Sequence, residues 1–235
     1  MSTSRIIAFS DTHNKHEELD LPTPQKGDIL VFAGDMCLQG HDREVYRFVT
    51  WLSKLGYENK IVIAGNHDIP FDSSSYCILK ELFTPESRVT YLQNSGVWCQ
   101  GLYFWGSPVT PSFGNLAFNV TRSSEQLREH WERIPKHTDV LITHGPPAHI
   151  LDLGIPGKDG SERKCGCEHL LERLEIVKPK IHIFGHIHEN YGKVRSKHTE
   201  FYNVSVLDNK YKMVNPPTII ELRTWDKNAD RTTDG

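Results

Sequence analysis

The chain has 235 residues and a mass of 26.9 kDa, with 37% hydrophobic and 24% charged residues. That length allows one sizeable hydrophobic core without requiring a second domain, and the composition is too apolar for a disordered chain. A formal net charge of −3 disfavours a large nucleic acid as a partner, because long DNA or RNA contacts need a broad basic surface, whereas a small phosphorylated substrate stays open.

Eight apolar runs of strand length recur along the chain, with helical patterns between them. The expected strands cover 5–10, 28–33, 60–64, 101–105, 140–143, 181–184, 200–204 and 217–222. Several runs are continuously apolar rather than alternating, which predicts strands buried on both faces of a sheet. The expected helices cover 42–55, 123–132 and 166–178. This order predicts an α/β layered architecture.

The segments between these elements give further predictions. Apolar segments 89–92 and 97–105 are separated by Asn94-Ser95-Gly96, which indicates a β-hairpin and therefore a mixed sheet. Residues 146–160 hold so many Pro and Gly that we expect a long loop. Residues 226–235 have almost no apolar content, so we expect a single domain over 1–225 followed by a flexible tail.

The sequence also bears on compartment. No apolar run reaches the roughly 18 residues of a membrane span, and the N-terminus lacks a charged region followed by an apolar stretch. The five cysteines are odd in number and irregularly spaced, which favours reduced thiols. We therefore expect a cytoplasmic protein without a membrane partner. Cys165 and Cys167 are expected to be structural or exposed, because no second cysteine pair completes a tetrahedral metal set.

Five short polar motifs stand in order along the chain, each directly after an apolar run. They are Asp11-Thr12-His13, Gly34-Asp35, Gly65-Asn66-His67-Asp68, Thr143-His144-Gly145 and Gly185-His186-Ile187-His188. In an open α/β sheet, residues after strands gather at the carboxyl edge, where ligands bind. Imidazole, carboxylate and amide oxygen, without thiolate, suit borderline divalent cations. The set therefore predicts a two-metal site that hydrolyses phosphate esters.

Each motif alone is weak, and the alternative is that these residues cap loops or lie on the surface. That alternative would leave several carboxylates and imidazoles at the ends of buried strands without a partner, which is a costly arrangement in the absence of a cation. The ordered set therefore favours the metal site.

The ordered set resembles that of the calcineurin-like metallophosphoesterases. Segments 106–108, 139–147, 184–189 and 215–217 are similar to the small metallophosphoesterase-domain-containing proteins known from animal brain and their microbial relatives, a group that resembles class III cyclic nucleotide phosphodiesterases. The resemblance spans nearly the whole chain. It implies a four-layer sandwich of two mixed β-sheets flanked by helices, with a dinuclear metal centre at one edge.

The resemblance also implies seven metal ligands: Asp11, His13 and His188 for one ion, Asn66, His144 and His186 for the second, and Asp35 as the bridge. A carboxylate has two oxygens and can join two cations roughly 3.5–4 Å apart, whereas an imidazole nitrogen serves one. Dividing His186 and His188 between the ions requires a bend after the strand, which Gly185 permits. Mn²⁺ or iron is expected, with Zn²⁺, Co²⁺ and Ni²⁺ as alternatives.

For the reaction, the hypothesis is in-line displacement at phosphorus by a hydroxide that bridges the metals. His67, which is not a ligand in the family, would protonate the leaving alkoxide or stabilise its charge, and Asp68 would orient His67. The alternative for His67 is a loop histidine paired with a backbone carbonyl.

The substrate class follows from the resemblance, which implies phosphodiesters such as 2′,3′- or 3′,5′-cAMP and cGMP, or aryl diesters. Alternatives are a low-turnover nucleotide-binding regulatory protein on the same fold, a small phosphomonoesterase or a protein phosphatase. Residues 34–40 lack the second carboxylate and the arginine of the protein Ser/Thr phosphatase signature, and the chain is too short for the capping domain of nuclease members. Oligomeric state stays open.

Several residues have two interpretations. Phe104, Trp105 and Phe113 either stack a base or belong to the core, and the core is favoured. Four cations either meet a phosphate or are solvated, and solvation is favoured: Lys15, Lys158, Arg163 and Lys164. We expect His182 to be a hydrogen-bonded structural residue. The remaining histidines without a role are expected to be exposed: His16, His41, His149 and His198.

Overall fold

Two mixed β-sheets packed face to face form the centre of the molecule. The computed structural model describes residues 2–224. The first sheet has the order β15 (Thr218–Thr224), β1 (Ser2–Phe9), β2 (Ile29–Ala33), β3 (Asn59–Ile63) and β4 (Val89–Tyr91). The second has the order β13 (Gly192–Arg195), β14 (Glu200–Asn203), β12 (Ile181–Phe184), β9 (Val140–Thr143), β6 (Leu102–Ser107) and β5 (Ser95–Cys99). Each sheet has a parallel interior and antiparallel pairing at an edge.

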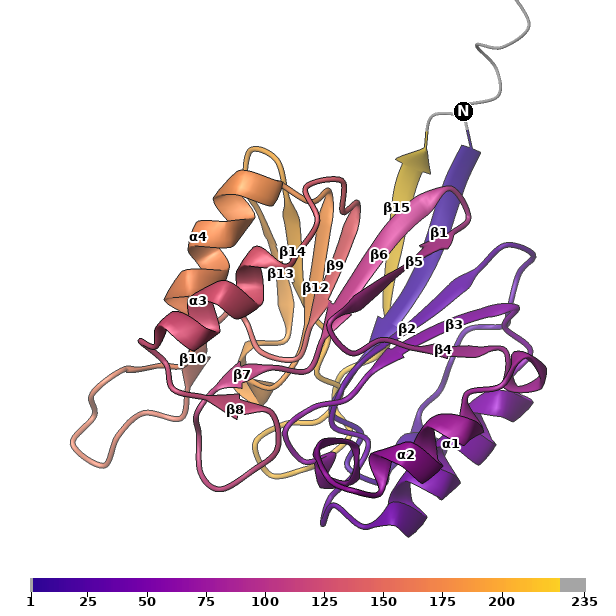
Figure 1. Ribbon diagram of the computed structural model, residues 1–235, viewed down its shortest axis with the longest axis horizontal. Helices are drawn as coiled ribbons and strands as arrows, with labels where there is room; N and C mark the ends of the chain where they lie inside the picture. Colours follow the sequence, from indigo (N-terminus) through magenta and orange to yellow (C-terminus); the bar gives the residue numbers. More distant parts are fainter. Residues whose placement is uncertain (1, 225–235) are drawn as a thin grey trace, which may run out of the picture.

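Helices cover the outer faces of both sheets. They are α1 (Asp42–Lys54), α2 (Tyr76–Leu79), α3 (Glu125–Glu132) and α4 (Glu168–Val177). Figure 1 shows α1 and α2 outside the first sheet and α3 and α4 outside the second. The predicted α/β fold, with two mixed sheets between helical layers in a single domain, is confirmed. No helix within residues 2–224 is long and apolar enough to cross a bilayer.

Short elements lie at the carboxyl edge of the sheets. Two small ribbons are formed by β7 (Thr110–Pro111) with β8 (Asn119–Val120) and by β10 (Leu153–Gly154) with β11 (Arg163–Lys164). Single 3-10 turns occupy His16–Glu18, Ile69–Asp72, Lys80–Leu82, Pro85–Ser87 and His188–Asn190. The expected loop over 146–160 is therefore irregular except for β10.

The continuous apolar runs are explained by burial on both faces. Alternate residues such as Ile6, Val31 and Ile142 point between the two sheets and have no more than 1% exposure. Their sequence neighbours point outward under the helices, where the ring centroids of Phe32 and Phe48 of α1 lie 4.5 Å apart. A strand with both faces covered has no position that favours a polar side chain.

Most predicted strands and helices are present, with ends that differ by at most three residues. The strands at 140–143 and 181–184 are found with the predicted bounds. Phe104 and Trp105 belong to the core, as favoured, but the same prediction for Phe113 is wrong: it is 46% exposed, because it lies on the turn between β7 and β8 rather than in a buried strand. The tail predicted over 226–235 lies outside the residues that the structure describes, and the domain bounds stay a prediction.

The predicted hairpin between 89–92 and 97–105 is wrong. β4 pairs in parallel with β3 in the first sheet, whereas β5 pairs antiparallel with β6 in the second. The real hairpin turns at Gln100 and Gly101, whose φ angles of 50° and 76° suit a two-residue turn between twisted strands. Residues 92–94 instead carry the chain from one sheet to the other.

His16 is buried rather than exposed, which corrects a second prediction. Its ring centroid lies 5.3 Å from that of Phe48 and 5.1 Å from that of Trp51, both on α1. The short turn that begins at His16 folds back onto α1, and the residues between β1 and β2 carry no periodic signal for that contact. His41, His149 and His198 are exposed, as expected.

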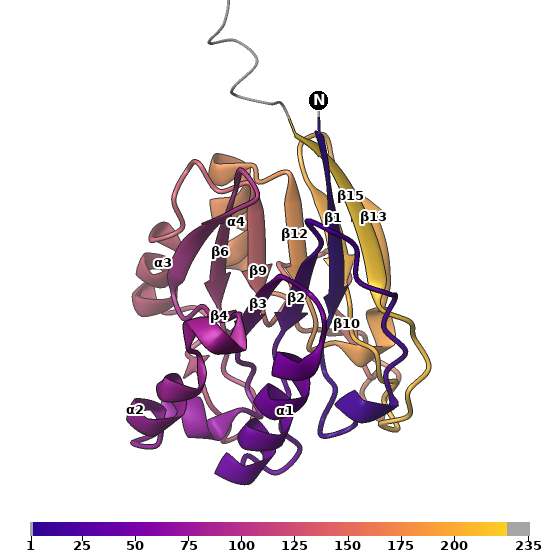
Figure 2. The same ribbon diagram turned by 90° about the vertical axis from the view of Figure 1, so that its right-hand side faces the viewer.

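The two sheets meet at their carboxyl ends. The Ser10 N–H donates to the Val204 carbonyl at 3.0 Å, and the Val206 N–H donates to the Ser10 carbonyl at 3.2 Å. Figure 2 shows β1 and β15 of the first sheet beside the strands of the second sheet, and the loops after the parallel strands converge below them. This junction positions the polar motifs.

Candidate metal centre

The five motifs converge at the junction of the sheets. Asp11, Asp35 and Asn66 follow β1, β2 and β3 of the first sheet, whereas His144 and His186 follow β9 and β12 of the second. Parallel strands end at one edge, so residues that are distant in sequence meet there. Each sheet supplies part of the centre, and neither contains all of it.

Three of these residues have a left-handed backbone. The φ angles are 55° for Asp11, 63° for Asp35 and 70° for His186, and each residue comes within two positions of a strand end. This conformation is uncommon for residues other than glycine and is concentrated at functional sites. At each of these three residues it turns the backbone sharply at the edge of the sheet.

One cluster of metal-binding atoms contains Asp11, His13 and His188, whose donor atoms lie within 4.8 Å of one another. Asp11 Oδ1 is 3.6 Å from His188 Nε2. Asp11 is fully buried, and the Nε2 atom of His13 is buried without a hydrogen-bond partner. A buried nitrogen with a free lone pair facing a carboxylate is the arrangement that a bound cation would satisfy.

A second cluster contains Asp35, His144 and His186. Asp35 Oδ2 is 3.3 Å from His144 Nε2, which also lies 2.8 Å from Asn66 Oδ1. Asp35 Oδ2 is 3.7 Å from His13 Nε2 of the first cluster, and Asp35 also groups with His13 and His67. Asp35 therefore lies between the clusters, where the predicted bridge would be.

Backbone carbonyls orient the imidazole rings. The Nδ1 atoms lie 2.9–3.1 Å from carbonyl oxygens in four pairs: His13 with Cys37, His144 with Ala33, His188 with Asp208, and His67 with Leu38. An Nδ1–H that donates to a carbonyl leaves the Nε2 lone pair free to point into the site. In His13, His144 and His188 this contact would direct Nε2 toward a metal ion.

Asp11 is fixed by hydroxyls and by the chain itself. Ser10 Oγ and Ser205 Oγ both donate to Asp11 Oδ2, the second at 2.5 Å, and the His186 N–H is 3.1 Å from both carboxylate oxygens. A side chain on Gly185 would come within 2.2 Å of Asp11 Oδ2. Gly185 therefore permits the close approach of the two loops.

Asp68 has a different place from the predicted one. Its carboxylate accepts the backbone N–H groups of Asp35 at 3.0 Å, Cys37 at 2.8 Å and Gly65 at 2.7 Å, and it also lies 3.3 Å from the Met36 N–H. The partner of the His67 ring is the Leu38 carbonyl instead. Three of these four donors belong to residues 35–37. Asp68 therefore fixes the backbone of the loop that carries Asp35.

The electrostatics of the site favour positive charge. Burial raises the pKa of Asp35, but the neighbouring His144 and His13 bring the pKa well below its ordinary value. Burial lowers the pKa of His144, yet Asp35 outweighs that effect and raises the pKa to about 9. His188 behaves likewise beside Asp11, with a pKa raised to about 9. Two buried carboxylates thus attract cationic partners.

A cavity of about 420 Å³ opens beside both clusters. Its walls include His13, Asp35, Asn66, His67, His186 and His188 from the motifs, and Phe113, Arg122, Arg163, Lys164 and Tyr211 from elsewhere. A concave site with a few convergent polar groups is the usual setting for a small ligand.

The sequence matches the family model for calcineurin-like phosphoesterases over residues 4–190. The chain belongs to this family. It is 39% identical to human metallophosphoesterase domain-containing protein 1 over 94% of this chain and 72% of that protein, and 37% identical to a UPF0046 protein, K07C11.7, of Caenorhabditis elegans over 86% and 69%. The crystal structure of TT1561 of Thermus thermophilus shares the fold, with a TM-score of 0.60 at 14% identity over 94% of this chain and all of that one.

The residues of this phosphoesterase fit the divalent metals that family members bind. The donors are hard and borderline oxygen and nitrogen atoms, one imidazole nitrogen is buried without a partner, and the rings are fixed from behind. The structure brings all seven predicted ligands together, and their roles in coordination stay predictions.

Sequence reasoning missed several supporting residues. Ser10 was visible as a polar residue at the end of a strand, and Ser205 as one just after another. Tyr211 had no signal, yet its ring centroid lies 4.8 Å from that of His13 and 5.4 Å from that of His188. The carbonyls behind the histidines belong to the backbone, which side-chain identity does not reveal.

Proposed function

We propose that this protein is a phosphodiesterase that uses two divalent metal ions, with cyclic nucleotides and aryl phosphodiesters as substrates. The observation that supports it is the position of Asp35 between two clusters of carboxylate and imidazole donors at the wall of a ligand-sized cavity.

The proposed ligands divide as the motifs predict. Asp11, His13 and His188 would hold one ion, Asn66, His144 and His186 the other, and Asp35 both. Mn²⁺ or iron suits this mixture of nitrogen and oxygen donors. Bound ions would neutralise the phosphoryl oxygens and increase the acidity of water at the site.

His67 is the proposed proton donor. Its ring contacts the Leu38 carbonyl through Nδ1 and packs edge-on at 4.7 Å against the His13 ring, so Nε2 is the nitrogen left for the substrate. The backbone N–H of His67 donates to Asp35 Oδ1 at 2.8 Å. This hydrogen bond holds the proposed proton donor next to the proposed bridging carboxylate. A protonated His67 would donate to the leaving oxygen of the ester.

A small phosphorylated ligand, a nucleotide by preference, is the partner that we propose, since the cavity is of small-molecule size. All five cysteines are free thiols. Free thiols are usual in the cytoplasm, where we propose that the protein acts.

The test combines metal content with turnover. Apo protein would be reloaded with Mn²⁺ or Fe²⁺, and hydrolysis of bis-p-nitrophenyl phosphate, p-nitrophenyl phosphate, and 2′,3′- and 3′,5′-cAMP would be compared. Asp35→Asn keeps the shape of the side chain and removes the bridging charge, and Asp20→Asn changes an exposed carboxylate that belongs to none of the motifs and does not line the cavity. We expect about two metal equivalents and diesterase activity in the wild type and Asp20→Asn, with both lost in Asp35→Asn.

A nucleotide-binding protein of low turnover is the second candidate, because side-chain identity and geometry do not set a rate. Tight binding of AMP without turnover under any of these metals would favour it. Faster hydrolysis of p-nitrophenyl phosphate than of the diester would instead indicate a phosphomonoesterase.

A further inference from the structure

One large aromatic side chain faces the cavity beside the candidate metal centre. Phe113 is 46% exposed, lines the cavity, and has its ring centroid 6.3 Å from that of His186. Single exposed aromatic residues are common on convex surfaces. This ring instead borders a concave site, next to a residue assigned to the second metal ion.

The position of Phe113 is fixed by its own loop. Asn119 Oδ1 accepts the Phe113 N–H at 3.3 Å, and Asn119 Nδ2 donates to the carbonyls of Gly114 at 3.2 Å and Leu116 at 3.0 Å. These contacts close the turn between β7 and β8. A residue on a turn that is formed before a ligand arrives adds little backbone ordering cost to binding.

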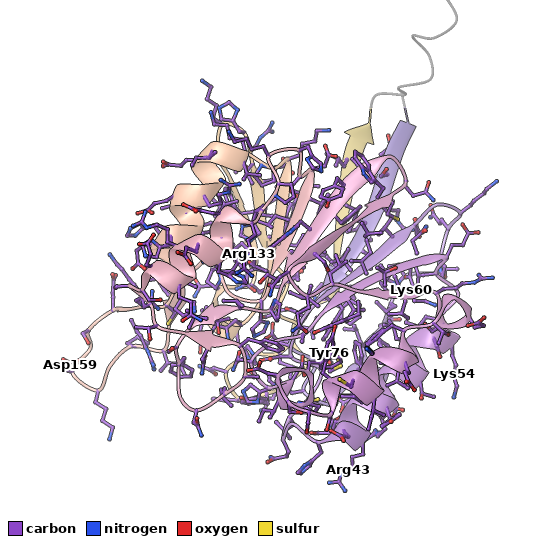
Figure 3. All side chains as sticks on the ribbon, in the orientation of Figure 1. Arg43, Lys54, Lys60, Tyr76, Arg133 and Asp159 are labelled. Atoms are coloured by element: carbon purple, nitrogen blue, oxygen red, sulfur yellow. The ribbon has the colours of Figure 1, made fainter. Side chains whose placement is uncertain are left out.

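Arg163 of β11 covers one side of this ring. Its guanidinium carbon lies 4.6 Å from the Phe113 ring centroid. Figure 3 shows Asp159 at the tip of the segment between β10 and β11, away from the body, whereas Arg163 at its base lines the cavity. Arg163 is therefore exposed, as favoured, and also has a defined contact with the Phe113 ring.

The other exposed ring at the site is already engaged. Tyr211 packs edge-on against His13 and His188, and Lys15 Nζ donates to its backbone carbonyl at 2.6 Å. Phe113 is the more exposed of the two rings, at 46% against 37% for Tyr211, and it has contacts with the His186 ring and the Arg163 guanidinium. Phe113 thus has the more open ring surface at the cavity.

We propose that Phe113 determines specificity by stacking on a planar ring in the ester, with Arg163 as its partner in that platform. This inference rests on the proposed function and assigns to Phe113 the selection of phosphate esters that carry an aromatic ring, such as a nucleobase, over those that carry none. Rings of many kinds stack on Phe and on guanidinium groups, because every such ring has a π face.

Calorimetric binding separates this role from a structural one. AMP and ribose 5-phosphate share a sugar phosphate and differ in the base, so the ratio of their affinities isolates stacking. We expect Phe113→Ala to weaken AMP binding about five- to a hundredfold and to leave the affinity for ribose 5-phosphate unchanged. Phe113→Trp should keep the affinity for AMP close to that of the wild type. Tyr46→Ala, which removes an exposed ring on α1 outside the cavity, serves as the control and should change neither affinity.

Equal losses for both ligands, or no loss for either, would overturn the proposal. Phenyl phosphate that binds as tightly as AMP would support stacking and identify a simple aryl ester as a sufficient ring. Failure of the proposed function has a different signature: no turnover by the metal-loaded wild type, whatever the Phe113 variants do to the AMP preference.

Discussion

The Oδ2 atom of Asp68 accepts the backbone N–H of Asp35 at 3.0 Å, so one buried carboxylate holds the chain that carries another. Asp68→Ala would leave this donor and those of Cys37 and Gly65 buried without a partner, at roughly 1–3 kcal/mol for each group. We expect a loss of at least about 3 kcal/mol in the free energy of unfolding, measured by urea denaturation. Asp68→Asn keeps one acceptor oxygen and should lose less.

His67→Gln tests the proton donor. We expect kcat to fall roughly 100- to 10,000-fold for a diester with an alkoxide leaving group, and far less for bis-p-nitrophenyl phosphate, because p-nitrophenolate leaves without protonation. Metal content should be unchanged, since His67 is outside the proposed ligand set. Equal losses on both substrates would argue against proton donation by His67.

Metal addition should stabilise the fold. Because the clusters form only in the folded chain, Mn²⁺ at a hundred times its Kd should add about 2.7 kcal/mol and raise Tm by about 5–10 °C for each occupied site. Differential scanning calorimetry after EDTA treatment, with and without Mn²⁺, measures this shift. In Asp35→Asn, Mn²⁺ should raise Tm by much less than in the wild type. A full increase in that variant would contradict the proposed role of Asp35 as the bridge.

Gly185→Ala and Gly145→Ala form a matched pair. The added Cβ would come within 2.2 Å of Asp11 Oδ2 and of Ser10 Oγ at position 185, whereas at position 145 the nearest atom is Thr110 Cγ2 at 3.3 Å. Overpacking at 185 should cost about 1–3 kcal/mol of stability and displace Asp11, with loss of metal affinity. Gly145→Ala should retain most of both, and similar behaviour of the two variants would exclude the close approach as the cause.

His16 should make stability depend on pH. Burial, more than the nearby Arg47, lowers its pKa to about 4, and both ring nitrogens lack hydrogen-bond partners. The unfolded chain, with an ordinary pKa near 6.5, binds the proton first as pH falls, so stability decreases from about pH 6.5 toward pH 4. Across that window the free energy of unfolding of His16→Phe should fall about 2–3 kcal/mol less than that of the wild type, as measured by urea denaturation in EDTA. Parallel pH profiles would refute this.

The sequence predicts the architecture and the convergence of motifs because both depend on side-chain polarity. Continuous apolar runs mark strands covered on both faces, and a polar residue after such a run, as at Asp35 or His144, must lie at a strand end. The pairing of β4 was not predictable in this way. Apolarity at 89–92 requires burial but does not say which strand supplies the hydrogen bonds.

The supporting contacts also escaped prediction, for a related reason. Asp68 accepts hydrogen bonds from backbone N–H groups such as those of Asp35 and Gly65, and every chain offers such donors at every position except proline. Phe113 reaches the site because two small ribbons, β7 with β8 and β10 with β11, lie beside it, and two-residue strands have no periodic pattern. Such contacts depend on tertiary placement rather than on local residue types.

Because the seven predicted ligands are divided between the two sheets, the complete centre can form only after both sheets have folded and docked. Asp11 follows β1 and His188 follows β12, so the whole span between them must be made and docked before both clusters exist. A nascent or cleaved chain that lacks the second sheet would keep Asp11, Asp35 and Asn66 but none of the histidines at 144, 186 and 188. Tight ion retention would therefore distinguish finished molecules from partly folded ones.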